Sequence, residues 1–153
     1  MKPLNGFKLG ITAGLIAGLL LAMVLKGFQS LTGKQVYTLL LNIDWVPNMP
    51  NRLPETVELA LHLVVSVPIG ILYVSLTKRM TTPRRWMVGL LFGLLTAVTW
   101  FPLTAISDRV PAATDLAALL LWLLGHICYG LGLALICSLQ SRGRIGNNIM
   151  VKR

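Results

Sequence analysis

The chain has 153 residues, of which 55% are hydrophobic and only 12% are charged, and its formal net charge is +9. Four apolar stretches are each about long enough to cross a bilayer core of roughly 30 Å, more apolar sequence than one soluble core can absorb. This composition excludes a soluble globular domain and predicts an integral membrane protein whose immediate partner is the lipid bilayer.

The four apolar stretches cover residues 9–25, 57–77, 86–106 and 116–139. All four are predicted to be helical, because an isolated span in lipid must satisfy its own backbone hydrogen bonds. We therefore predict an all-α polytopic fold, a single membrane domain over residues 1–153 with four transmembrane helices in an antiparallel bundle. No small-x-small cleavage site follows the first stretch, so we expect it to be retained rather than removed as a signal peptide.

Small residues recur at every fourth position in the first and third stretches. The residues concerned are Gly10, Gly14, Gly18, Ala22, Gly89, Gly93 and Ala97. Lipid provides no hydrophobic drive for helices to associate, so close packing through small residues takes its place. Residues 14–24 and 89–99 match at six of eleven positions, which hints at two related helical hairpins in parallel orientation. The same glycines would also suit a homo-oligomer or a membrane partner, and the sequence does not choose between these contacts.

A loop over residues 27–54 joins the first two spans. Val36, Leu39, Leu40 and Ile43 recur at helical spacing within it, which predicts a short interfacial helix. Trp45 would suit the membrane interface. The loop returns through a segment made stiff by three prolines, Pro47, Pro50 and Pro54.

The basic residues gather on one side of the predicted bundle. Ten of them precede the first span, join the second to the third or follow the fourth: Lys2, Lys8, Lys78, Arg79, Arg84, Arg85, Arg142, Arg144, Lys152 and Arg153. Four cations and all five acidic residues lie on the other side. The positive-inside rule then places both termini in the cytoplasm and the 27–54 loop outside. Because this topology explains the cations, and no stacking aromatics lie among them, nucleic acid is excluded as a partner.

Two spans carry a polar and aromatic stripe within an arc of about 80° at 100° per residue. The second has Glu55, Glu58, His62, Ser66 and Tyr73, and the fourth has Asp115, Trp122, His126, Tyr129 and Cys137. His62 and His126 each precede a cytoplasmic cation by sixteen residues, a rise of about 24 Å, so we expect them at equal depth. The two stripes are predicted to meet inside the bundle, where eight of these residues form a polar intramembrane site: Glu55, Glu58, His62, Ser66, Tyr73, Asp115, His126 and Tyr129.

Ionisable residues inside a membrane have several interpretations, which stay open at this stage. The two histidines could be structural and hydrogen-bond to neighbouring helices, or they could ligate a b-type haem with room made by Gly70, Gly125 and Gly130. A proton or cation path would run through Glu55, Glu58, His62, His126 and Asp115. The spans show no paired-carboxylate, serine–histidine or metal-ligand motif, so we predict no enzyme, no catalytic residue and no metal beyond that haem.

Three apolar segments resemble the YagU-like group of small bacterial inner-membrane proteins. They are LHLVVSVPIGILYVSL, LLFGLLTAVTWFPL and LLGHICYGLGLAL, with the specific positions His62, Ser66, Tyr73, Gly93, Pro102 and His126. The resemblance implies a bacterial cytoplasmic membrane and a four-helix fold, without an established reaction or substrate. We therefore expect a non-enzymatic membrane component. Small proton, ion or solute transport is the first alternative, and a bis-histidine haem protein is the second.

Overall fold

The structure is a computed structural model that describes residues 5–42, 53–107 and 110–150. It contains six helices: α1 (Gly6–Thr32), α2 (Val36–Leu41), α3 (Glu55–Thr77), α4 (Thr82–Ala97), α5 (Trp100–Ile106) and α6 (Leu116–Met150). The described residues form no strand, and four helical stretches are long and apolar enough to cross a membrane, which confirms the predicted fold class. The predictions for Ile43, Trp45, Pro47 and Pro50 fall outside the described residues.

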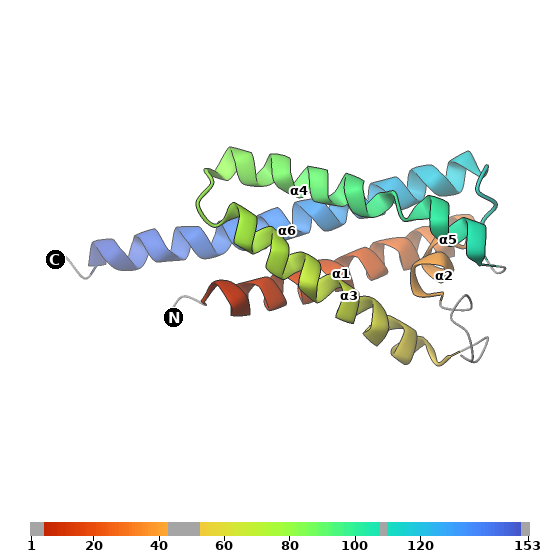
Figure 1. The fold of residues 1–153 in the computed structure, drawn as a ribbon, viewed down its shortest axis with the longest axis horizontal. Helices are drawn as coiled ribbons and strands as arrows, with labels where there is room; N and C mark the ends of the chain where they lie inside the picture. Colours follow the sequence, from red (N-terminus) through yellow and green to blue (C-terminus); the bar gives the residue numbers. More distant parts are fainter. Residues whose placement is uncertain (1–4, 43–52, 108–109, 151–153) are drawn as a thin grey trace.

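The long helices run up and down the bundle, as Figure 1 shows. Both ends of the chain and the α3–α4 connection lie at one end, called here the terminal end, and α2 and α5 lie at the other, called the α2 end. Helix α1 pairs with α3, α4 pairs with α6, and α1 also contacts α6. Helices α3 and α4, although joined by a short connection, share few contacts, among them the ring pair of Tyr73 and Phe92. A cavity separates the two helices toward the α2 end.

The recurring small residues explain how the helix pairs approach so closely. All seven are buried: Gly10, Gly14, Gly18, Ala22, Gly89, Gly93 and Ala97. A Cβ atom at Gly14 would lie 2.6 Å from the Ser66 carbonyl oxygen on α3, and one at Gly89 would lie 2.6 Å from the Gly130 carbonyl oxygen on α6. The positions aligned in the sequence therefore pack in the same manner in the two hairpins, and packing within one chain accounts for their spacing.

The predicted span 86–106 is present, but it is not one continuous helix. A turn at Val98 and Thr99 separates α4 from α5, and the amide of Phe101 bonds only three residues back, to the Val98 carbonyl. Pro102 explains the break, because proline has no N–H and its ring collides with the carbonyl four residues earlier, which is that of Val98. The break turns Thr99 and Pro102 toward the cavity described below.

The predicted short helix is also present, as α2. Val36 and Leu39 are fully buried, so its apolar residues pack onto the end of the bundle, against α1, α3 and α6. The side chain of Gln29 on α1 holds the start of α2, because its Oε1 accepts hydrogen bonds from the amides of Tyr37 and Thr38. Helix α2 thereby closes one end of the bundle.

Candidate functional site

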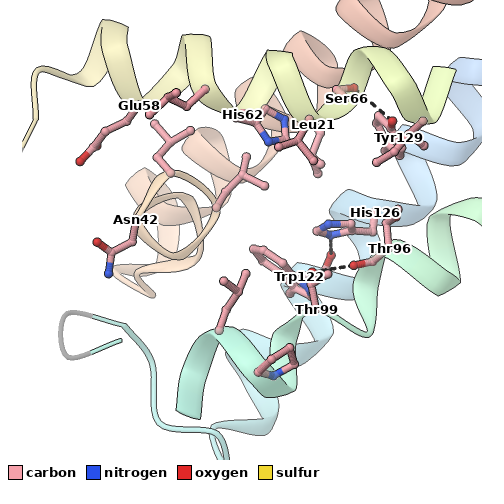
Figure 2. Close-up of a pocket in the computed structure, with 17 residues that line it drawn as sticks. Leu21, Asn42, Glu58, His62, Ser66, Thr96, Thr99, Trp122, His126 and Tyr129 are labelled. Carbon is pink, nitrogen blue, oxygen red and sulfur yellow. Dashed lines mark hydrogen bonds between the residues drawn. The ribbon is translucent and has the colours of Figure 1, made fainter. Parts of the chain in front are cut away.

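A cavity of about 320 Å³ lies between α3 and α4–α5 toward the α2 end, and Figure 2 shows the side chains around it. Its lining is largely apolar. Val65 on α3 is 60% exposed, and Pro102 on α5 is also exposed. Because both belong to the cavity wall, the cavity opens between α3 and α5 onto the surface that acyl chains would cover in a membrane. We call it the apolar cavity.

Two helices supply most of its polar groups. Glu58, His62 and Ser66 follow each other along α3 at intervals of four residues, about one helical turn each. His126 and Tyr129 face them from α6, as Figure 2 shows. The structure thus brings the two histidines to one cavity.

The two polar stripes meet at the inner end of the cavity. The Ser66 hydroxyl donates a hydrogen bond to the Gly14 carbonyl at 2.7 Å, which uses its single hydrogen. The Tyr129 hydroxyl, 3.1 Å from the Ser66 oxygen, is therefore the donor in their hydrogen bond. The Tyr129 oxygen keeps its own capacity to accept a hydrogen bond.

The histidine rings offer acceptors as well. Nδ1 of His126 lies 2.9 Å from the Trp122 carbonyl, which can only accept, so Nδ1 carries the proton and Nε2 of the neutral ring is an acceptor. The His62 ring faces the backbone carbonyl of Gly18, which can only accept and therefore favours the proton on Nδ1. Its Nε2 is buried and has no hydrogen-bond partner among the described residues.

The donor groups around the cavity are already occupied. The Trp122 indole N–H donates to the Ala97 carbonyl at 3.0 Å. The hydroxyls of Thr96 and Thr99 donate to backbone carbonyls of α4, at 2.8 and 2.6 Å. Beyond its mouth, where Asn42 and Glu58 lie, the apolar cavity therefore presents hydrogen-bond acceptors to a ligand.

A second, more polar pocket of about 350 Å³ lies at the α2 end between α1, α2 and α3. We call it the polar pocket. Lys26 and Glu55 form an ion pair across it at 2.6 Å, and the Tyr37 hydroxyl donates to the same carboxylate at 2.7 Å. Burial and the Glu55 carboxylate raise the pKa of Tyr37 above its ordinary value, so this hydroxyl remains a donor at neutral pH. Leu41, Asn42 and Glu58 line both the polar pocket and the apolar cavity.

Of the eight stripe residues predicted to form one site, five line the apolar cavity: Glu58, His62, Ser66, His126 and Tyr129. Glu55 lies in the adjoining polar pocket. Tyr73 does not belong to the site, because its hydroxyl donates to the Arg85 carbonyl at 2.8 Å and its ring stacks edge-on against Phe92. The structure therefore does not bring Tyr73 together with the residues that line the apolar cavity.

Asp115 is also outside the site. Its Oδ2 atom lies 2.7 Å from Lys34 Nζ, and its Oδ1 accepts a hydrogen bond from the amide of Ala118 at the start of α6. The hydrogen bond from Lys34, followed by the one from Ala118, lowers the pKa of Asp115. Its role is to begin α6 and to hold the α1–α2 connection against it.

The sequence analysis did not predict several residues that line the apolar cavity: Leu41, Asn42, Thr96, Thr99 and Leu103. Threonine and leucine within an apolar span carry no signal of their own. Pro102 was the available clue, because a proline inside a span marks a point where the helix turns and exposes backbone and side chains that would otherwise face lipid.

The glycines expected to make room for a haem are used in helix packing. Gly70 would place a Cβ 2.6 Å from Gly14 Cα, and Gly125 would place one 2.6 Å from Leu25 Cδ2. Gly130 is in contact with Gly89. The described part of the chain also contains no group of three or more His, Cys, Asp or Glu residues that could hold a metal ion.

A family model matches residues 4–144, nearly the whole chain, and its description is "Family of unknown function (DUF6789)". The chain belongs to this family. No curated protein and no solved structure matches it. The DUF6789 assignment and the four apolar helices make it a membrane protein without specifying its activity, and the resemblance to the YagU-like group stays a prediction.

Proposed function

We propose that this chain is a non-enzymatic membrane protein that binds a small, mostly apolar molecule carrying a hydrogen-bond donor in the apolar cavity. The observation that carries the proposal is the Nε2 atom of His62, a buried acceptor without a partner among the described residues. Leaving such a group unpaired costs about 1–3 kcal/mol. A ligand O–H or N–H group would remove that cost, and His126 Nε2 and the Tyr129 oxygen offer further acceptors in the same cavity.

The form of the cavity supports binding rather than conduction. The hydrogen bond between Ser66 and Tyr129 marks its inner end. Nearer the terminal end, α1 and α3 are in backbone contact, where a Cβ at Gly70 would lie 2.5 Å from the Gly14 nitrogen. A proton or solute path would have to cross this packed region, so transport would require the helices to separate.

Photolabelling tests this proposal directly. The protein in phosphatidylcholine nanodiscs is irradiated with a medium-chain alkanol carrying a diazirine, and the adducts are mapped by mass spectrometry. We expect adducts on cavity-lining segments of α3, α5 and α6, reduced by His62→Leu, which keeps the volume and removes the acceptor. Val64→Leu is the matched control, because Val64 is 67% exposed and does not line the cavity. Adducts spread evenly over the lipid-facing surface and insensitive to His62→Leu would overturn the proposal.

A bis-histidine haem is the second candidate. His126 hydrogen-bonds to the helix backbone through Nδ1 and leaves Nε2 as an acceptor, an arrangement typical of metal-ligating histidines, and the buried Nε2 of His62 lines the same cavity. The packing of Gly70, Gly125 and Gly130 against other helices counts against it. A haem protein would show a Soret band that His62→Ala and His126→Ala each abolish. A colourless protein after expression with added haem precursor would exclude this candidate.

We further propose that the protein resides in the bacterial cytoplasmic membrane with both termini in the cytoplasm. The support is the resemblance to bacterial inner-membrane proteins and the four cations of the α3–α4 connection, Lys78, Arg79, Arg84 and Arg85. After Cys128 and Cys137 are replaced by serine, an impermeant maleimide applied to intact cells should label Gln35→Cys but not Arg79→Cys. The reverse pattern would contradict the orientation.

A further inference from the structure

The polar pocket and the apolar cavity meet at a shared wall. Leu41 and Asn42 at the end of α2 and Glu58 on α3 line both. Figure 2 shows Glu58 and Asn42 on the α2 side of the cavity, with the histidines farther in. A ligand lying across this wall would have its polar end among charged groups and its apolar end between α3 and α6.

The charged side chains around this wall differ in whether they have a partner. The Lys26 ammonium group is paired with Glu55 at 2.6 Å and also lies 5.4 Å from the centre of the Tyr37 ring. Glu55 accepts the Tyr37 hydroxyl as well. Glu58 has no ion pair and no side-chain hydrogen bond among the described residues. One carboxylate at the junction of the two pockets therefore has no compensating charge within the part of the chain that the structure describes.

We propose that the two pockets form one bipartite site for a single-chain amphiphile with a protonated amine, in which Glu58 binds the ammonium group and the apolar cavity holds the chain. This inference rests on the proposed function and names the class of ligand. An ammonium group has three N–H donors and a positive charge, which match the Glu58 carboxylate and the nearby acceptors. An anionic head group would instead meet two carboxylates, and Lys26, the cation among the described residues that line the pocket, is already paired with Glu55.

The size of the cavity favours one alkyl chain. About 320 Å³ suits a single chain better than a diacyl lipid, and the opening between α3 and α5 allows the chain to enter from the membrane. A quaternary ammonium head would carry the charge but no N–H donor, and it would leave the acceptors at the mouth unsatisfied. The site is therefore expected to prefer a primary amine over both a neutral alcohol and a quaternary ammonium ion.

Competition against the diazirine alkanol tests this inference. At pH 7, n-dodecylamine should prevent labelling of the cavity at about one tenth of the concentration needed for n-dodecanol, because a hydrogen bond between charged groups in a partly buried site contributes about one tenfold step in affinity. Glu58→Gln should abolish this preference while the alkanol still labels the cavity, and Glu58→Asp should retain it. Comparing variants in the same nanodiscs cancels the different partition of amine and alcohol into lipid.

The outcomes separate this inference from the one on which it rests. Labelling of the cavity without an advantage for the amine, or an advantage that survives Glu58→Gln, overturns the amine inference and leaves the proposed function standing. Equal competition by n-dodecyltrimethylammonium also overturns it, since the site would then recognise charge without N–H donors. Absence of alkanol labelling in the cavity overturns the proposed function itself.

Discussion

Replacement of Gly14 by alanine should destabilise the protein, whereas the same replacement at Gly27 should not. Both residues belong to α1, so the intrinsic gain in helix propensity is the same, up to about 1 kcal/mol. A Cβ at Gly14 would lie 2.6 Å from the Ser66 carbonyl oxygen and 2.8 Å from Val67 Cα, compared with 3.4 Å or more in an ordinary contact. A Cβ at Gly27 would have no heavy atom within 4 Å.

The difference between these variants follows from what must move. The atoms facing Gly14 belong to the α3 backbone, so α1 and α3 would have to separate by about 0.8 Å to restore a 3.4 Å contact from 2.6 Å. Overpacking of this kind costs about 1–3 kcal/mol. Separation would also lengthen the hydrogen bond from Ser66 to Gly14, which contributes about 1 kcal/mol. We therefore expect Gly14→Ala to lose about 1–3 kcal/mol net, and Gly27→Ala to gain a fraction of 1 kcal/mol.

The assay is unfolding of both variants in mixed micelles with increasing dodecyl sulfate, followed by tryptophan fluorescence. Opposite shifts of the midpoint relative to wild type would support the packing described here. Equal stabilisation of both variants would refute it, because it would mean that Gly14 faces lipid rather than the backbone of α3.

Two further changes test the ends of α6 and α4. Asp115→Asn should lower thermal stability at pH 7. Because Lys34 lowers the folded-state pKa of Asp115, the stability deficit of the variant should be complete at pH values well above the ordinary pKa of 3.8, and it should disappear as the pH falls through the lower folded-state pKa. A deficit independent of pH would contradict this reasoning. Trp122→Phe should cost about 1–3 kcal/mol in dodecyl sulfate unfolding, since the Ala97 carbonyl loses its indole donor. A cost no larger than that of Trp86→Phe would show that the hydrogen bond is unimportant.

Helical periodicity was sufficient to find most of the candidate site. A spacing of three or four residues places side chains on one face of a helix, which predicts that Glu58, His62 and Ser66 share one site. All three line the apolar cavity. Periodicity does not show which neighbouring helix packs against that face at each point along α3. Tyr73 shares that face, but it lies near the terminal end, where α4 is close enough for Phe92 to fill the space.

Contacts between residues far apart in the chain could not be predicted from the sequence. The Lys26–Glu55 pair joins residues twenty-nine positions apart, and the Lys34–Asp115 pair joins residues eighty-one positions apart. Neither spacing has a periodic signature, and each carboxylate was instead assigned to a stripe on its own helix. The Thr99 wall of the cavity depends on a break in backbone hydrogen bonding that single-residue patterns do not show.

The central position of α1 has a consequence for how the protein is made. Helix α1 leaves the ribosome before both α3 and α6, and its second face waits for α6, where Leu25 packs against Gly125 a hundred residues later. Lys34 likewise meets Asp115 only when the start of α6 emerges. During membrane insertion the face of α1 that packs against α6 therefore stays exposed until α6 has been made, and the apolar cavity forms only once α6 is in place.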